Sequence, residues 1–141
     1  SGHIFFKERW FGFDDALYTG ARLLEILSKT DKTCAEVFAD LPDSINTPEI
    51  NIHFDKHGQQ FEAMDKLAKS ADFSDAEITT IDGVRVDYTN GEHWGWGLVR
   101  PSNTTPCLVL RFEANDQQML IDIQDKFRTW LGNSNISTNN F

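Results

Sequence analysis

Residues 77–112 narrow the possible folds more than any other part of the sequence. Two runs with strand-like composition, EITTI and VRVDY, are joined by Asp82-Gly83, a strong signal for a tight hairpin. A third run, WGWGLVR, follows the turn TNGEH, and a fourth contains the alternating residues Leu108, Leu110 and Phe112. Successive strands joined by short turns pair antiparallel. The sequence therefore predicts an antiparallel sheet.

Two segments with helical spacing accompany these strands. Their apolar residues are Phe61, Met64, Leu67 and Ala68 in the first, and Met119, Ile123, Phe127 and Trp130 in the second. Asn115 or Asp116 lies near the start of the second helix, and Gly132 is expected just past its end. Two helices covering one face of an antiparallel sheet form an economical α+β arrangement, which we expect here.

The first part of the chain has a different pattern. Ile4–Phe6 indicates a short strand, and a turn then leads into a helix with the apolar residues Leu17, Ala21, Leu24 and Leu27. A strand followed by a helix is typical of α/β domains, so we expect residues 1–31 to be the C-terminal remnant of one. A linker is expected at 32–47, with a possible short helix in CAEVFADL, and a second domain at 48–141.

The charge of the chain disfavours two classes of partner. The 141 residues carry a formal net charge of -9, whereas binding to nucleic acid or to an anionic membrane depends on clustered Lys and Arg. The sequence shows neither the roughly 20 apolar residues of a membrane-spanning helix nor a signal-peptide pattern at its start. Cys34 and Cys107 lack a C-x-x-C spacing, and Cys107 has the position of a core residue. A reducing cytoplasm is the expected location.

Between the last two strand runs lies a polar loop stiffened by prolines. It comprises Arg100, Ser102, Asn103, Thr104 and Thr105, with Pro101 and Pro106. The guanidinium can bind a phosphate bidentately, the hydroxyls and the amide can donate hydrogen bonds, and successive backbone N–H groups can form an anion-binding nest. This chemistry suits an oxyanion such as phosphate. The alternative is an ordinary turn, because Ser, Asn, Thr and Pro are common turn residues.

Longer stretches of the sequence resemble a known family. These stretches are SGHIFFKERWFGFDDALYTGARLLEILS, TPEINI, DGVRVDY and WGLVRPSNTTPCLVLRFEA. They resemble the C-terminal part of the bacterial phosphomannomutase/phosphoglucomutase family, in the α-D-phosphohexomutase superfamily, and RPSNTTP is the most specific of them. The resemblance implies a four-domain enzyme with a Rossmann-like α/β third domain and a TATA-binding-protein-like α+β last domain. It also implies that the substrate phosphate is bound by Arg100, Ser102, Asn103 and Thr104.

The resemblance extends to the first three residues. The sugar-binding loop of the family reads Gly-Glu-x-Ser-Gly-His, so Ser1-Gly2-His3 implies that the chain begins inside this loop and lacks its glutamate. Ser1 then matches the serine that contacts the sugar. His3 is a further candidate for the sugar site, with a structural histidine as the alternative.

The resemblance implies an isomerase that interconverts the 1-phosphates and 6-phosphates of mannose and glucose. The superfamily transfers phosphate through a phosphoserine in its first domain, with a sugar 1,6-bisphosphate as intermediate and activator. It holds Mg2+ with an Asp-x-Asp-x-Asp motif in its second domain. Neither a catalytic serine-histidine loop of that kind nor the Asp-x-Asp-x-Asp motif occurs here. We therefore expect no catalytic residue, no metal ligand and no activity from this chain alone. Its expected partners are a phosphosugar and the remaining three domains.

One turn departs from the family pattern. The family runs from DGVRVDY almost directly into GWGLVR, whereas this chain reads DYTNGEHWGWGLVR, a longer turn with His93 and Trp94. We expect this longer hairpin to lie beside the phosphate site. It is expected to be neutral surface variation; the alternative is that it alters closure of the domain over the substrate. The form SNTTP favours the mannose/glucose branch over glucosamine-phosphate mutases, whose loop resembles Arg-x-Ser-Gly-Thr-Glu-Pro.

The alternative function is a free-standing TATA-binding-protein-like binding or interaction module without catalysis. The expected start inside a functional loop disfavours it. So does the first helix, because its apolar face lacks the sheet that such a helix should cover. DNA binding is disfavoured by the acidic charge, and a shared fold does not imply a shared function. For the mutase, we expect the last domain to close over the substrate about a hinge at residues 42–48.

Overall fold

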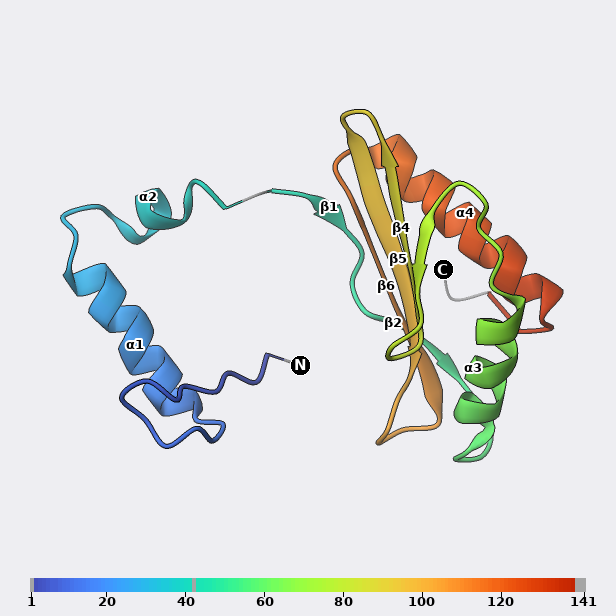
Figure 1. Ribbon diagram of the computed structural model, residues 1–141, viewed down its shortest axis with the longest axis horizontal. Helices are drawn as coiled ribbons and strands as arrows, with labels where there is room; N and C mark the ends of the chain where they lie inside the picture. The colour runs from blue at the N-terminus through green and yellow to red at the C-terminus, as the bar shows by residue number, and fades with distance from the viewer. Residues whose placement is uncertain (1, 42, 139–141) are drawn as a thin grey trace. The chain divides into compact units, whose positions relative to one another are not determined.

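The computed structural model describes residues 2–41 and 43–138 of the chain. The chain divides into two compact units, Ser1–Pro42 and Asp43–Phe141, and each is described by itself. Figure 1 shows helices in the first unit and a sheet with helices in the second.

The described part of the second unit contains one antiparallel sheet of six strands, in the order β1-β6-β5-β4-β3, with β2 also paired to β6. The strands are β1 (Ile45–Asn46), β2 (Ile50–His53), β3 (Glu77–Thr79), β4 (Val84–Asn90), β5 (His93–Pro101) and β6 (Cys107–Ala114). Fully and partly buried residues alternate along β4 and β5, so one face of the sheet forms the core. The antiparallel sheet predicted from the sequence is confirmed.

Two helices, α3 (Gln59–Ser70) and α4 (Gln117–Asn133), cover the buried face of this sheet (Figure 1). The core forms where their apolar residues meet those of the strands. Its fully buried large side chains include Leu67, Leu108, Leu110, Phe112, Ile123, Phe127 and Leu131. The α+β arrangement, with helices on one face of an antiparallel sheet, is confirmed.

Helix α4 lies so close to β5 that a glycine is required between them. A Cβ atom at Gly97 would lie 2.6 Å from Cε2 of Phe127, closer than non-bonded atoms approach. The Phe127 ring in turn meets Phe112 edge to face, with ring centroids 5.1 Å apart. Gly97 therefore sets how tightly the helix packs on the sheet.

Helix α4 begins where the sequence predicts, but it ends later than predicted. Asp116 is the N-cap, with its side chain accepting a hydrogen bond from the N–H of Met119 at 2.8 Å. The prediction that Gly132 lies just past the helix end is wrong, because the helix continues to Asn133. Asn135 takes the left-handed conformation, with φ of 58°, that a glycine commonly provides after a helix.

The first unit contains α1 (Ala16–Ser28) and α2 (Cys34–Phe38). The Asp15 side chain caps α1 by accepting a hydrogen bond from the N–H of Tyr18 at 2.9 Å. Helix α2 begins with a reciprocal capping box between Thr33 and Glu36. Within the described ranges, no helix combines the length and apolarity that crossing a membrane requires.

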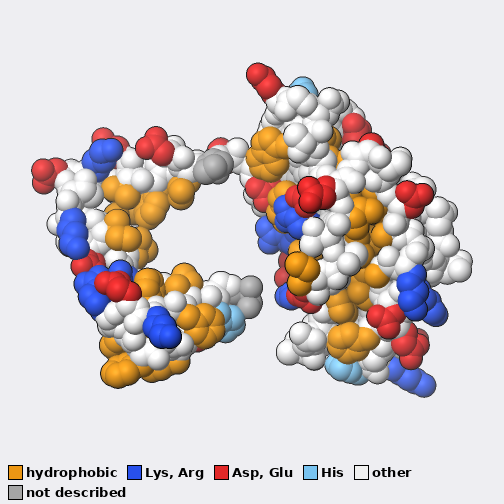
Figure 2. Space-filling model, viewed as in Figure 1, with side chains coloured by type: hydrophobic (Ala, Val, Ile, Leu, Met, Phe, Trp, Pro, Cys, Tyr) orange, Lys and Arg blue, Asp and Glu red, His pale blue; other side chains and the backbone are white. Residues whose placement is uncertain are grey.

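Instead of the strand expected at Ile4–Phe6, the structure forms a single antiparallel bridge between Phe5 and Asp14. A strand needs a neighbour for its backbone hydrogen bonds, and residues 2–41 supply no further one. The apolar face of α1 is uncovered within this unit, since Leu17 and Leu24 are 89% and 67% exposed. Figure 2 shows apolar side chains gathered on the surface of the unit.

The segment predicted as a linker, residues 32–47, contains regular structure. Helix α2 occupies its first part and β1 its last part. Thr47 is buried; its N–H donates to the carbonyl of Phe112 at 3.0 Å, and its Oγ1 accepts from the N–H of Phe112 at 3.1 Å. The Ser44 hydroxyl donates to the Glu113 carboxylate at 2.5 Å. The end of the segment is thus fixed to the sheet, and the domain boundaries stay predictions.

Candidate functional site

The polar loop singled out by the sequence connects β5 to β6 at one end of the sheet (Figure 1). Two backbone hydrogen bonds close it: the N–H of Ser102 donates to the carbonyl of Cys107 at 2.9 Å, and the N–H of Cys107 donates to that of Thr105 at 2.8 Å. Asn103 and Thr104 are exposed at the tip. The strands therefore hold the loop in a tight turn whose polar tip faces solvent.

The Ser102 hydroxyl organises the loop from within. Its Oγ accepts hydrogen bonds from the N–H groups of Thr104 and Thr105 at 3.3 and 3.2 Å, and lies 2.9 Å from Oγ1 of Thr105. These are two of the backbone N–H groups expected to form an anion-binding nest. Because the loop uses them itself, an anion must be bound through side chains and the other backbone donors of the loop.

Arg100 lies near the end of β5, beside the hairpin that joins β3 to β4. Its Nη1 donates to Oδ2 of Asp82 at 3.1 Å, and its side chain is 39% exposed. Gly83 permits this approach, with φ of +93°, because a Cβ atom there would lie 2.1 Å from the carbonyl oxygen of Val99. The ion pair with Asp82 uses one of the five guanidinium N–H donors, so an anion can bind to others.

Gln60, in the first turn of α3, contacts both ends of the loop. Its Nε2 donates to the carbonyl oxygens of Ser102 and Thr105 at 3.1 and 3.4 Å, and its Oε1 accepts from the N–H of Gly58 at 2.8 Å. The side chain is 0% exposed. Sequence reasoning missed this residue. Its position could have indicated a special role. Gln60 lies four residues before Met64, on the buried stripe of the helix, where a polar side chain is unusual.

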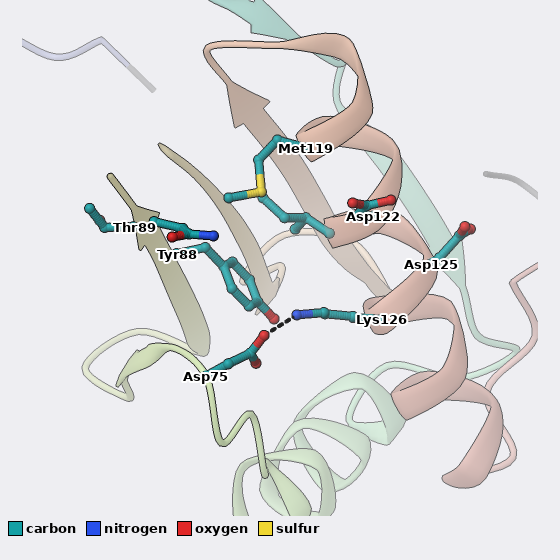
Figure 3. A pocket seen from close by; sticks show the side chains of 9 residues that line it. Asp75, Tyr88, Thr89, Met119, Asp122, Asp125 and Lys126 are labelled. Carbon is teal, nitrogen blue, oxygen red and sulfur yellow. Dashed lines mark hydrogen bonds and ion pairs between the residues drawn. The ribbon is translucent and has the colours of Figure 1, made fainter. Parts of the chain in front are cut away.

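A separate cavity of about 540 Å3 lies between β4 and α4 (Figure 3). Asp75 and Lys126 form an ion pair beside it, and Nζ of Lys126 lies 4.5 Å from the ring centroid of Tyr88. The Tyr88 hydroxyl is buried without a hydrogen-bond partner among the described residues. Burial, together with the charge of Asp75, raises the pKa of Tyr88. Tyr88 pairs with Gly95, near the opposite end of β5 from the polar loop, roughly 20 Å away at about 3.3 Å per residue.

The longer β4–β5 hairpin also lies away from the loop, which corrects the expectation that it borders the phosphate site. Strand β5 begins at His93 and ends at Pro101, so a full strand separates the two features. Nδ1 of His93 lies 2.8 Å from Oδ2 of Asp116, which fastens the hairpin to the start of α4. The N–H of Met119, and then His93, hold the pKa of Asp116 below its usual range.

The predicted sugar-binding residues belong to the first unit. Ser1 lies outside the described residues. His3 is exposed, and its Nδ1 forms a hydrogen bond with Oδ2 of Asp14. This contact agrees with the structural alternative for His3, and a sugar-binding role for Ser1 and His3 stays a prediction.

Comparisons with known proteins assign both parts of the chain. Residues 49–129 match the family described as phosphoglucomutase/phosphomannomutase, C-terminal domain, and residues 1–45 match its alpha/beta/alpha domain III. The chain belongs to the phosphoglucomutase/phosphomannomutase family. It is 59% identical over 131 residues to a phosphomannomutase/phosphoglucomutase of Pseudomonas putida, a match that covers 93% of this chain and 27% of the relative.

Other members of this family show the same partial coverage. A phosphoglucomutase of Neisseria meningitidis serogroup A is 56% identical over 129 residues, which is 91% of this chain and 27% of that protein. The crystal structure of a phosphoglucomutase/phosphomannomutase family protein from Burkholderia thailandensis has a TM-score of 0.84 and 46% identity, covering 99% of this chain and 28% of that one. The chain thus spans about a quarter of the length of the relatives it matches. The family assignment made from the sequence is confirmed.

The Mg2+ implied for the parent enzyme does not fit the described residues of this chain. Across 2–41 and 43–138, no three side chains of His, Cys, Asp or Glu are grouped so that they could hold a metal ion. The spaced carboxylates of α4 have other partners, since Asp122 accepts from Gln118 at 2.8 Å and Asp125 accepts from Arg128 at 2.5 Å. These carboxylates therefore form hydrogen bonds with neighbouring side chains of the same helix.

Proposed function

We propose that the β5–β6 loop binds the phosphate group of a hexose phosphate. The observation that carries this proposal is the clustering of one guanidinium, two hydroxyls and one amide at the same end of β5, from Arg100, Ser102, Asn103 and Thr104. Such donors suit phosphate, because each of its oxygens can accept several hydrogen bonds. The tight closure of the loop by the flanking strands supports a preformed site.

For the parent protein we propose a mutase that interconverts mannose or glucose 1-phosphate and the corresponding 6-phosphate. The names of its relatives, phosphomannomutase/phosphoglucomutase and phosphoglucomutase, support this reaction class. In the reaction implied by the resemblance, a phosphoserine outside this chain donates phosphate to the sugar. A sugar 1,6-bisphosphate forms, and it turns over before phosphate returns to the serine. Mg2+ belongs to the parent through residues outside this chain.

The role proposed for this chain is positioning. The loop holds the phosphate that is not being transferred, at either end of the sugar, while bonds form and break elsewhere. Correct placement supplies a large share of the catalysis in phosphoryl transfer, because such catalysis consists mainly of aligning the reacting groups and stabilising their charge. The chain alone is therefore proposed to bind phosphosugars without converting them.

Arg100→Ala in the full-length protein tests this role. A hydrogen bond to a charged group contributes about 1.5 to 3 kcal/mol, so kcat/KM should fall by about tenfold or more, mainly through KM. Arg128→Ala is a matched control, because Arg128 is similarly exposed and is also paired with an aspartate. An unchanged kcat/KM in Arg100→Ala would contradict the assignment.

We further propose that the second unit closes over the substrate as a hinged domain. Within the expected hinge at 42–48, Ser44 and Thr47 contact β6, so we propose that bending occurs on the N-terminal side of Ser44. Pro42, within the expected hinge, lies outside the described residues. Hinged opening suits a mechanism in which the bisphosphate must turn over between two transfers.

A free-standing binding module is not favoured as the alternative, because both units match domains of the same enzyme family. We propose a phosphosugar and the other domains of the parent as the partners. The cytoplasm is the proposed location, since Cys34 and Cys107 are free thiols, as is usual in a reducing compartment.

A further inference from the structure

We propose that Gln60 is a positioning residue for phosphate binding: it turns the Ser102–Asn103 peptide so that the N–H of Asn103 faces the phosphate. This inference rests on the proposed function of the loop and deepens it. Gln60 belongs to α3 and lies outside the RPSNTTP motif, so the residues of the motif alone do not indicate its role.

The orientation of the Gln60 amide follows from its three partners. Nε2 faces two carbonyl oxygens, those of Ser102 and Thr105, and Oε1 faces the N–H of Gly58. The reversed orientation would set an oxygen against two oxygens and a nitrogen donor against an N–H. Because the side chain is fully buried, water cannot take over these bonds. One amide group therefore fixes the N-terminus of α3 and both ends of the loop together.

Peptide geometry carries this constraint to the solvent side of the loop. Among the described residues no peptide bond is cis, and in a planar trans peptide the carbonyl and the following N–H point in opposite directions. The carbonyl of Ser102 points to the buried Gln60 amide, so the N–H of Asn103 points away from it. That direction leads to the exposed tip formed by Asn103 and Thr104.

The neighbouring peptides cannot supply the same donor. The N–H groups of Thr104 and Thr105 are directed to the Ser102 hydroxyl. The carbonyl of Thr105, the second partner of Gln60, precedes Pro106, which has no N–H. The N–H of Asn103 is therefore the backbone donor that the Gln60 contact can aim at an anion.

Loss of the Gln60 donors should change binding as well as stability. The carbonyl of Thr105 keeps its bond to the N–H of Cys107, but the carbonyl of Ser102 would lose its Gln60 donor and face an apolar side chain. Rotation of this peptide toward water relieves that cost. The same rotation would direct a carbonyl oxygen toward the phosphate and remove the Asn103 N–H from it.

Gln60→Met and Gln59→Met form a matched pair of variants. Both replace a glutamine in the first turn of α3, but Gln59 is exposed and its Oε1 accepts from the N–H of Lys56, away from the loop. The 141-residue chain is titrated with inorganic phosphate while NMR follows the backbone amides, and thermal unfolding checks the fold. We expect a saturable shift of the Asn103 amide in the wild type and in Gln59→Met. In Gln60→Met we expect phosphate affinity to fall about tenfold or more and the Asn103 shift to collapse.

The outcomes separate this inference from the function on which it rests. Phosphate binding by Gln60→Met with wild-type affinity and a wild-type Asn103 shift would overturn the positioning role. If Gln60→Met does not fold, the wild-type chain and Arg100→Ala provide the test. Phosphate binding that is lost in Arg100→Ala supports the proposed function. If that binding leaves the wild-type Asn103 amide unshifted, the positioning role of Gln60 is overturned and the proposed function stays intact. No phosphate binding by the wild type, with unchanged kcat/KM for Arg100→Ala in the full-length protein, overturns both. In the full-length protein, Gln60→Met should raise KM more than it lowers kcat.

Discussion

Asp82→Asn should strengthen phosphate binding. The Asp82 carboxylate lies 3.1 Å from Nη1 of Arg100, so a phosphate bound to Arg100 would sit about 6 Å from a like charge. In water, two unit charges at about 6 Å repel by about 0.7 kcal/mol, which gives about 1.4 kcal/mol for a dianion. A Debye length of about 8 Å at physiological salt reduces this to about 0.7 kcal/mol, equivalent to about threefold in affinity. The exposed ion pair that the substitution removes contributes about 0 to 1 kcal/mol to folding.

Isothermal titration with phosphate at two salt concentrations measures this effect. We expect Asp82→Asn to bind about threefold more tightly than the wild type at about 0.15 M salt, with the advantage disappearing at about 1 M. Asp122→Asn is the control, because it removes the same charge from an exposed position on α4. Weaker binding by Asp82→Asn would refute the reasoning and show that Asp82 orients Arg100 for its ligand more than it repels that ligand.

Three further predictions concern packing, pH and motion. Gly97→Ala should lower the free energy of unfolding by about 1 to 3 kcal/mol through overpacking against the α4 phenylalanine, whereas Gly132→Ala, with open space around it, should be neutral or stabilising by about 0.5 to 1 kcal/mol in denaturant unfolding. Because the pKa of Asp116 is lowered in the folded state, its stabilisation is present above the unfolded pKa and is lost on acidification. The Tm of the wild type should therefore fall more steeply below about pH 4 than that of Asp116→Asn. Hydrogen exchange of the full-length protein should slow at residues 39–41 and at Asp43 when a hexose phosphate binds, and equal exchange with and without ligand would count against the hinge.

The parts of the fold that the sequence predicted are those specified by local patterns. Alternating apolar residues and the Asp82-Gly83 turn predict the hairpins of the sheet, and apolar residues at helical spacing predict α3 and α4. The polar loop was found in the same way, because its residue types stand out between two strands. Its chemistry needs few long-range contacts to be recognised.

The features that the sequence did not predict depend on contacts between distant segments. Gln60 acts on a loop more than forty residues away, and only its unusual place on a buried stripe hints at this. The Asp82–Arg100 ion pair follows from strand register, which sets the β3–β4 hairpin beside the end of β5. The short run at Ile4–Phe6 looked like a strand, but a strand depends on a partner that local pattern cannot supply.

The expected position of the longer hairpin was wrong because the length of β5 was not taken into account. The longer hairpin at His93 and the polar loop both adjoin β5 in the sequence, which suggested that they lie together. A strand of this length carries its two ends far apart, and the structure places them at opposite ends of the sheet. The end of α4 was misplaced for a local reason, because Asn135 supplied the left-handed residue expected of Gly132.

The central claim is that the β5–β6 loop is a preformed phosphate site. An NMR titration of the chain with glucose 1-phosphate, following the amides of Arg100 and Ser102 through Thr105, tests it most directly. We expect weak, saturable shifts confined to this loop and its contacts on α3, reproduced by inorganic phosphate and lost in Arg100→Ala. An absence of shifts at high millimolar concentrations of both ligands would contradict it, since a site closed by two strands and fastened by a buried glutamine should need no other domain to form.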